Sequence, residues 1–246
     1  MVNGQTRTRP TFLRHNESGT SLLELMGAMA AGMVVLGATL QSLAHFQHEF
    51  SHQQDRITQQ QDLRLGLELL EQELQLAWSG SLSTIMAEAV EFTANIHGLM
   101  THVTAAAATG QTTIAVDDGL GWPERKTVRV CWNDQCEHFT LARTGQRNLL
   151  TLTESIPRMV PAGASVMVMN RVRYYGRPDA MGSLRLLRQI DGGASVLVGD
   201  IESVRFSYWD ERGRVAAQPA LVRRIVVEIS LPRHQLRAVR EVSLRT

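Results

Sequence analysis

A single acidic residue inside an apolar run is the first candidate for chemistry in this sequence. Glu24 lies near the start of the run, and residues 25–40 after it carry no charge. A carboxylate in an apolar segment costs several kcal/mol unless it finds a partner of opposite charge. Glu24 therefore indicates either a charge-pairing site or a residue held at the headgroup level of a plain membrane anchor.

Two cysteines form the second candidate. Cys131 and Cys136 are the only cysteines in the sequence, and they flank residues 132–135 between two strand-like runs. Facing positions beside a short hairpin loop can bring two Cα atoms within disulfide distance, and exported proteins meet oxidising surroundings. The spacing favours a disulfide, with free thiols or half of a metal site as the alternatives.

Three histidines are spaced so that one helix face could present them to a metal ion. His45, His48 and His52 lie three and four residues apart, with Glu49 beside them. Such spacing can bind a metal, but the sequence offers no second cluster of ligands. We therefore expect these histidines to be solvated or to lie between subunits, and we expect no metal site.

The common catalytic signatures are missing from the sequence, and its charge argues against nucleic-acid binding. We find no HExxH, GxSxG or glycine-rich phosphate loop. The acidic pairs at residues 117–118 and 210–211 lie close to glycine and are typical of turns. The formal charge is +1, from 25 basic and 24 acidic residues, which gives no basic surplus. We expect neither an enzyme nor a cofactor.

The apolar run around Glu24 requires a membrane-spanning helix. At about 1.5 Å per residue, residues 25–40 cover roughly 24 Å, most of a hydrocarbon core of about 30 Å. Residues 1–19 contain three arginines, and the first basic residue after the run is Arg56. Positive charge on one side keeps the N-terminus in the cytoplasm. The sequence therefore predicts a single-pass membrane protein with its N-terminus in the cytoplasm and an exported C-terminal domain.

The helical pattern continues beyond the apolar run to about Trp78. Its one-sided apolar stripe consists of Phe46, Phe50, Ile57, Leu63, Leu67, Leu70, Leu74 and Ala77. Glutamines dominate the opposite face, so this part should stand in water with its distal half covered. An isolated coiled-coil stalk is the alternative, but the stripe lasts for only about three heptads. We expect the helix to pack on a downstream sheet and to end at residues 79–81.

Strand patterns fill the chain from about residue 112, whereas residues 82–110 give no clear pattern. Runs rich in β-branched and aromatic residues are separated by Gly, Pro, Asn or Asp. They lie at residues 112–116, 127–131, 137–142, 148–152, 165–175, 183–190, 195–198, 203–209, 222–231 and 238–244. The predicted fold class is α+β, with a long N-terminal helix, transmembrane and then amphipathic, packed on an antiparallel β-sheet domain. The predicted divisions are residues 1–19, 20–80 and 81–246.

Residues 19–26, Gly-Thr-Ser-Leu-Leu-Glu-Leu-Met, resemble the processing signature of the type IV prepilin and pseudopilin family. Members of that family share a short basic leader, a Gly, and a Glu five residues into the mature chain ahead of an apolar helix. The resemblance implies that prepilin peptidase cuts between Gly19 and Thr20 and that the new amine of Thr20 is methylated. It also implies that Glu24 guides docking into a filament. One position departs from the family pattern: the usual first mature residue is Phe, whereas this chain has Thr20.

Charge chemistry fits this role for Glu24. Cleavage would leave a cationic amine on Thr20, and methylation would preserve its charge. At about 4 Å, an ion pair between this amine and the Glu24 of a neighbouring subunit is worth about 4 kcal/mol at an effective dielectric constant of about 20, before desolvation is subtracted. Such a pair could set the axial register of a filament.

The downstream half resembles, more loosely, the PilW-type minor pilins, with the J-type pseudopilin of type II secretion as a close second. The shared order is a Cys-bounded hairpin, residues 161–166 leading to residues 172–175, then residues 183–185, residues 204–208 and a terminal strand. The resemblance implies a minor pilin that acts in filament assembly or initiation at or near the tip. Its implied partners are prepilin peptidase, other minor pilins and the major pilin. The rival interpretation is an exported enzyme or binding domain on an uncleaved signal anchor.

Overall fold

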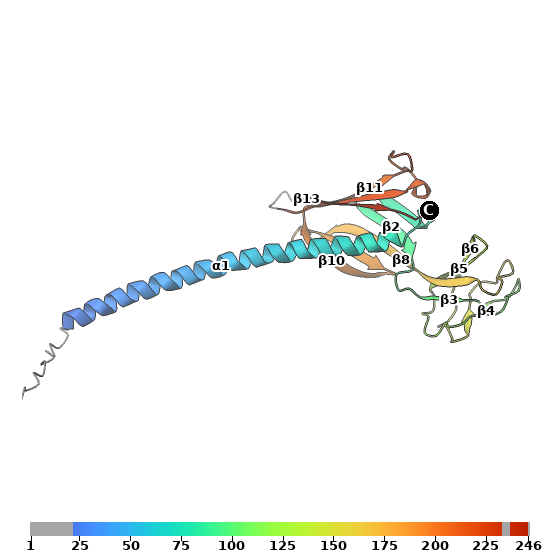
Figure 1. Ribbon diagram of the computed structural model, residues 1–246, viewed down its shortest axis with the longest axis horizontal. Helices are drawn as coiled ribbons and strands as arrows, with labels where there is room; N and C mark the ends of the chain where they lie inside the picture. The colour runs from blue at the N-terminus through green and yellow to red at the C-terminus, as the bar shows by residue number, and fades with distance from the viewer. Residues whose placement is uncertain (1–21, 233–236, 246) are drawn as a thin grey trace, which may run out of the picture. The chain divides into compact units, whose positions relative to one another are not determined.

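The computed structural model describes residues 22–232 and 237–245, apart from the side chains of His52, Asp55 and Ser79. The architecture is α+β, as predicted: one long helix and a set of antiparallel strands (Figure 1). The helices are α1 (Leu22–Gln75) and the short 3-10 helices η1 (Ser79–Ser81) and η2 (Pro219–Leu221). The strands are β1 (Leu82–Met86), β2 (Ala89–Ala94), β3 (Met100–His102), β4 (Thr113–Ala115), β5 (Thr127–Trp132), β6 (Gln135–Thr140), β7 (Leu149–Thr151), β8 (Ser165–Pro178), β9 (Leu184–Ile190), β10 (Gly193–Ile201), β11 (Ser203–Trp209), β12 (Arg224–Ser230) and β13 (Arg237–Ser243).

The chain forms two compact units, Met1–Ile57 and Thr58–Thr246, and α1 contributes residues to both. In the first unit the described residues are helical throughout, and their described side chains are exposed. The second unit contains the C-terminal part of α1 and all of the strands. The exposed part of α1 and the part in the folded core therefore consist of different residues of one helix.

The long strand β8 organises the sheets of the second unit. Its first half pairs with β3 and β5, and its second half pairs with β2 and β9, every pair being antiparallel. With β1, β6 and β10 these strands make an eight-stranded sheet, while β11, β12 and β13 make a three-stranded sheet and β4 and β7 pair by themselves. Residues from the two halves of β8 enter two separate hydrophobic cores, so this one strand connects them.

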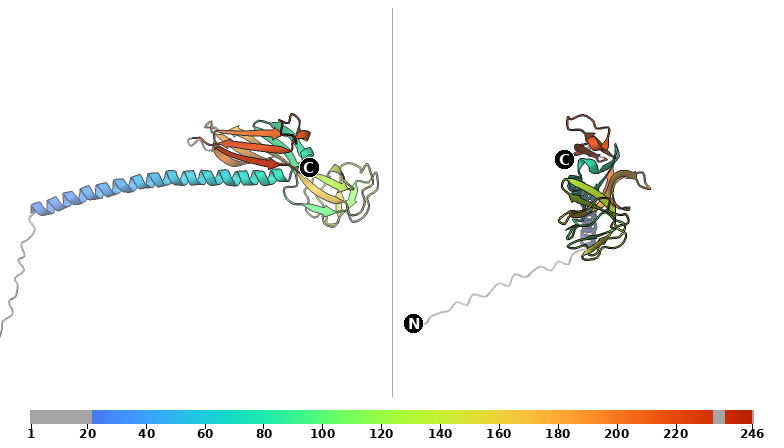
Figure 2. Two further views of the ribbon diagram at one scale, coloured as in Figure 1. Left: turned by 45° about the horizontal axis from the view of Figure 1, so that its top comes forward. Right: turned by 90° about the vertical axis from the view of Figure 1, so that its right-hand side faces the viewer.

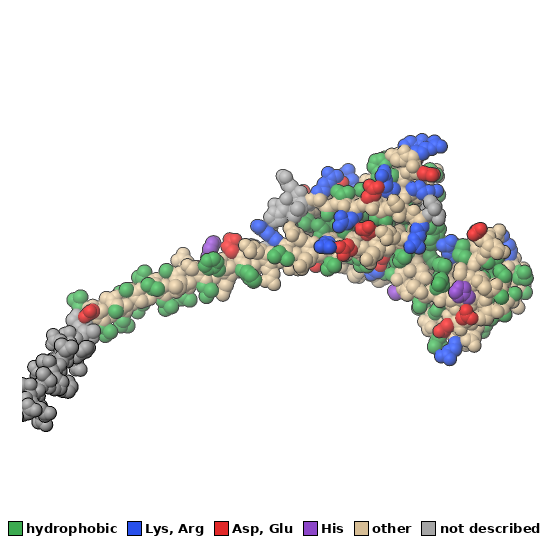
Figure 3. Space-filling model, in the orientation of Figure 1, with side chains coloured by type: hydrophobic (Ala, Val, Ile, Leu, Met, Phe, Trp, Pro, Cys, Tyr) green, Lys and Arg blue, Asp and Glu red, His purple; other side chains and the backbone are tan. Residues whose placement is uncertain are grey.

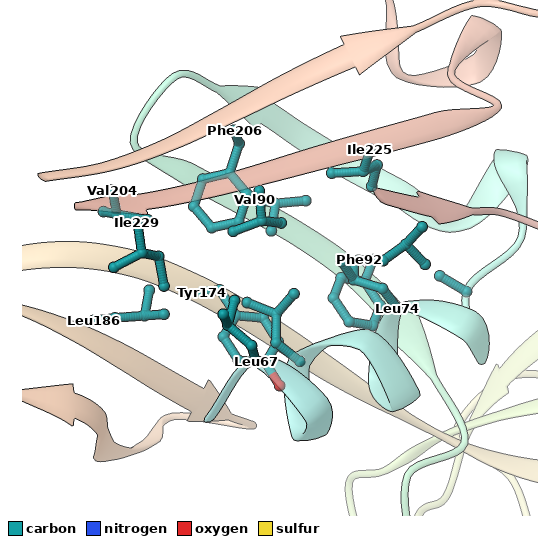
Figure 4. Packing of buried hydrophobic residues seen from close by; sticks show 14 of the residues in the cluster. Leu67, Leu74, Val90, Phe92, Tyr174, Leu186, Val204, Phe206, Ile225 and Ile229 are labelled. Atoms are coloured by element: carbon teal, nitrogen blue, oxygen red, sulfur yellow. The ribbon is translucent and has the colours of Figure 1, made fainter. Parts of the chain in front are cut away.

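The first core, which we call the α1 cluster, packs the C-terminal part of α1 between two sheets. The predicted stripe residues Leu63, Leu67, Leu70, Leu74 and Ala77 are buried here, as expected. Figure 4 shows Leu67 and Leu74 beside aromatic side chains of β2 and β8 and the inward-facing residues of β11 and β12. Figure 2 shows the three-stranded sheet alongside this part of α1. The prediction that the distal half of the helix is covered by its own downstream sheet is confirmed.

The second core, the insert cluster, lies within the segment between β2 and β8, residues 95–169. It includes Ile114, Val128, Leu141, Leu150 and Val166 and contains no residue of α1. The chain leaves the first core at Ala94 and returns at Asn170, and these two residues are Cα partners in the β2–β8 ladder. The segment is therefore an insertion whose two ends lie side by side.

The strand predictions are confirmed from β4 onward, but the structure corrects two details before that point. Residues 82–110, which give no clear pattern, contain β1, β2 and β3. The helix ends at Gln75, and η1 occupies the position where the end of the helix was predicted. Trp78 caps η1 through its backbone N–H, which donates a hydrogen bond to Ser81 Oγ (3.1 Å). This hydrogen bond explains the serine at position 81.

Candidate functional site

Glu24 lies in the first turn of α1, at the start of an apolar segment. The apolar side chains that follow it, such as Met29, Val34 and Leu40, are more than half exposed. Figure 3 shows hydrophobic side chains gathered along the visible face of this part of the helix. By length and composition, α1 can cross a membrane in this region. The segment thus offers an uncovered apolar surface that suits lipid or other apolar helices.

The predicted processing residues Gly19 and Thr20 lie outside the described residues, as does the rest of the leader. The proposed cut between them and the methylation of Thr20 stay predictions from the sequence. The same holds for an ion pair between Glu24 and a neighbouring Thr20 amine, because that pair involves a second chain.

A second carboxylate of α1, Glu73, is buried at the other end of the helix. Its side chain is 5% exposed and forms an ion pair with Arg188 of β9. Arg188 Nε donates a hydrogen bond of 3.0 Å to Glu73 Oε2, and the hydroxyl of Tyr174 of β8 donates to the same oxygen. Three elements are therefore joined by one buried carboxylate, which fixes the C-terminal part of α1 on the sheet.

The electrostatics of this triad follow from burial and charge. Burial first, and then the hydrogen bond to Glu73, raises the pKa of the Tyr174 hydroxyl, which therefore stays a donor. The hydrogen bond with Glu73 raises the pKa of Arg188 and keeps its guanidinium charged. The sequence analysis missed this triad. The available signal was an acidic residue on the same helix face as Leu70, Leu74 and Ala77, the buried stripe.

A close helix–strand approach adds to this attachment. Gly66 faces β10, and a Cβ atom there would lie 2.5 Å from Val198 Cγ2 and 3.2 Å from Leu197 Cγ. Nearby, Gln59 Nε2 donates a hydrogen bond of 3.0 Å to the backbone oxygen of Asp200. A helix residue without a side chain is thus what allows β10 to pack against α1.

Cys131 and Cys136 face each other across the β5–β6 hairpin, as their spacing predicts. Their Cα atoms lie 4.1 Å apart, and their sulfur atoms lie at bonding distance, 2.13 Å. The loop residues Asn133 and Asp134 both have positive φ, 45° and 60°, as tight hairpin turns require. The geometry thus fits a disulfide that closes one hairpin of the insert.

The same hairpin contacts the end of the helical region through Arg129. Its guanidinium lies 4.1 Å from the centroid of the Trp78 ring, and Nη2 donates to Cys136 Sγ at 3.1 Å. Burial lowers the pKa of this guanidinium from its ordinary value. Cation–π contact of this kind contributes about 0.5–2 kcal/mol. Arg129 therefore ties the insert to the chain just after α1.

The histidines on α1 are arranged along one exposed stretch of the helix. His45 and His48 are exposed, and the side chain of His52 lies outside the described residues. Across the described parts of the chain, no group of three or more His, Cys, Asp or Glu side chains is placed to hold a metal ion. The acidic pairs behave as turns, because Asp118 Oδ1 accepts the backbone N–H of Leu120 and Asp210 Oδ1 accepts that of Arg212.

Comparison with known proteins leaves the family open. A scan against protein-family models finds no match for this chain, and a search of curated proteins finds no relative. The functional argument accordingly rests on the residues and geometry described above.

Proposed function

We propose that this chain is a minor pilin-like subunit of a type IV pilus, processed by prepilin peptidase and acting in filament assembly at or near the tip. The observation that carries the proposal is the division of α1. One part is apolar, exposed and begins with Glu24, while the other is buried against antiparallel strands. A subunit stored in a membrane and then packed into a filament needs both parts on one helix.

The resemblance of residues 19–26 to the prepilin signature supports the proposal from the sequence side. In this proposal Gly19 and Thr20 flank the cut, and the Thr20 amine of one subunit meets Glu24 of another. The partners are prepilin peptidase, other minor pilins and the major pilin. The chain sits in the inner membrane with its N-terminus cytoplasmic and its second unit periplasmic until it enters the filament.

Processing is tested at Gly19, because the proposed peptidase tolerates little bulk before the cut. The mature wild-type chain should begin at Thr20 and carry one methyl group, as measured by intact mass and N-terminal sequencing. Gly19→Val should leave the leader attached. An unchanged mature mass for Gly19→Val would contradict the prepilin assignment.

Assembly is tested at Glu24. Glu24→Ala should leave export, cleavage and membrane insertion intact, because removing a charge from an apolar run does not hinder insertion. Its abundance in sheared filaments relative to membranes should nevertheless fall to background, and Glu24→Asp should be intermediate because its carboxylate reaches less far. The matched control is Glu49→Ala, which removes an exposed carboxylate beyond the apolar run of the same helix. Equal ratios for wild type and Glu24→Ala would favour a signal-anchored exported enzyme or binding domain.

The J-type pseudopilin of a type II secretion system remains the second candidate, because it shares part of the downstream pattern. Both assignments predict the same result at Gly19 and Glu24. The two assignments differ in the filament into which the chain would be built. Co-purification with a pilus or with secretion pseudopilins therefore distinguishes them.

A further inference from the structure

A charged cleft of about 720 Å³ opens on the second unit, where the insert joins the main sheet. Its floor is the outward face of β8, carrying Arg171 and Arg173, whose neighbours Val172 and Tyr174 point into the α1 cluster. One wall is the loop of residues 124–126 with the first residue of β5, and the other is the β9–β10 turn at residues 191–192. Junctions between structural parts are frequent binding sites in proteins.

The two walls are held together, so the cleft is already formed in the free protein. Asp191, in the β9–β10 turn, forms an ion pair with Lys126 of the opposite wall. It also accepts hydrogen bonds from Asn170 Nδ2 (2.7 Å) and from the backbone N–H of Arg171 (2.9 Å). A preformed site loses less conformational freedom when it binds a ligand.

Two guanidinium groups of the cleft are left for a ligand. Arg171 is paired with Glu91 at 2.7 Å, and Lys126 is paired with Asp191. Within the described residues, Arg125 and Arg173 make no side-chain hydrogen bond or ion pair. Arg173 lies 4.8 Å over the Tyr175 ring, and it also stands opposite Glu91 in the β2–β8 ladder, where, after the hydrogen bond from Arg171, its charge helps to lower the pKa of that carboxyl. Among the described residues that line the cleft, Glu124 is the one carboxylate that makes no side-chain hydrogen bond or ion pair.

The chemistry of these groups defines the ligand. Guanidinium forks bind carboxylates through paired hydrogen bonds. A purely anionic polymer would be repelled by the open carboxylate of Glu124, whereas a polypeptide that carries both signs of charge matches all three groups. The floor strands β2, β8 and β9 have strand neighbours on both sides, so recognition must use side chains rather than an added strand.

We propose that this cleft is a docking site for an acidic segment of a partner protein, whose carboxylates pair with Arg125 and Arg173 and whose basic side chain meets Glu124. The site lies in the second unit and uses none of the residues proposed for processing or filament packing. It therefore goes beyond the proposed function, and its failure would leave that function untouched.

The test measures binding of a fluorescent peptide to the full-length chain in detergent micelles. The probe is a short peptide of Glu and Ala with one Lys, and a peptide with Gln in place of Glu is the control. Arg125→Gln and Arg173→Gln should each raise its Kd by about threefold to tenfold, as expected for partly screened ion pairs. Arg205→Gln removes an exposed arginine of β11 outside the cleft and should change the Kd by less than about twofold.

Glu124→Gln provides a test of opposite sign. It should weaken binding of the Lys-containing peptide but strengthen binding of the same peptide with Ala in place of Lys. The docking proposal is overturned if the peptide does not bind, if the three arginine variants weaken binding equally, or if Glu124→Gln acts alike on both peptides. Tight binding of polygalacturonate that depends on Arg125 and Arg173, without peptide binding, would also overturn it and assign the cleft to an anionic polysaccharide.

Discussion

The two ends of α1 each hold a carboxylate next to apolar residues, but they differ in how far those apolar residues are covered. Glu73 finds Tyr174 and Arg188 within its own chain and is buried with them. Glu24 begins a segment whose apolar side chains are exposed, and its proposed partner is the Thr20 amine of another subunit. The comparison indicates that one part of the helix is stabilised by packing within its own fold, whereas the other leaves its apolar side chains uncovered and is long and apolar enough to cross a membrane.

Removing the buried carboxylate should have the largest effect on stability. Glu73→Ala leaves Arg188 charged and without its ion-pair partner, so the free energy of unfolding of the second unit should fall by about 3–5 kcal/mol. Denaturant unfolding of the full chain in micelles, followed by tryptophan fluorescence, measures this loss. The control Glu68→Ala breaks only an exposed pair with Arg64 and should cost less than about 1 kcal/mol. Equal losses would show that the triad contributes no more than a surface pair.

Truncating a leucine should sharpen the contrast between the two halves. Leu70 is fully buried in the α1 cluster, so Leu70→Ala should lower the unfolding free energy by about 2–5 kcal/mol. Leu36 is 60% exposed, and Leu36→Ala should change it by less than about 0.5 kcal/mol. The same denaturant titration measures both. A large loss for Leu36→Ala would mean that the first half of α1 is part of the folded core after all.

Glycine-to-alanine changes should affect the stability of the second unit differently in the two parts of the helix. Alanine raises helix propensity by about 1 kcal/mol at either place. At Gly66 the added methyl group would crowd Val198, and overpacking costs about 1–3 kcal/mol, so the second unit should be destabilised. At Gly37 no atom lies within 4 Å of the added Cβ, so Gly37→Ala should leave this unit unchanged. Thermal unfolding by circular dichroism compares the two variants, and stabilisation by Gly66→Ala would refute the close packing with β10.

The cysteine pair should affect the core that α1 does not enter. Replacing both cysteines by serine should cost about 2 kcal/mol by the chain-entropy argument for a short loop. Alkylation of the folded, unreduced protein should label neither Cys131 nor Cys136, as measured by mass spectrometry. Two labelled cysteines in folded protein would contradict the disulfide. The cysteines lie beside the insert cluster, whereas Glu73 lies beside the α1 cluster. The losses of unfolding free energy from the cysteine replacement and from Glu73→Ala should therefore be nearly additive when the changes are combined.

The sequence predicts those helices and strands in which apolar residues recur at a regular spacing over a short stretch. The alternation of Val204, Phe206 and Tyr208 identifies β11, and the spacing of the leucines identifies the buried face of α1. β2 also alternates, with Val90, Phe92 and Ala94 in the α1 cluster and Glu91 and Thr93 on the cleft face, so its signal was present in the sequence but was not recognised in so short a run. The Glu73 triad and the cleft could not be predicted in detail, because their partners are far apart in the sequence and meet only through β8 and β9.

The neighbouring positions of Ala94 and Asn170 also bear on how this protein could change over time. Both ends of the insert lie at adjacent points of one ladder, so the segment could be shortened, lengthened or exchanged without moving the strands that hold α1. The surface of the insert can then vary while the helix and its attachment to the sheets stay constant. A tight turn joining β2 directly to β8 would be the minimal form of this chain.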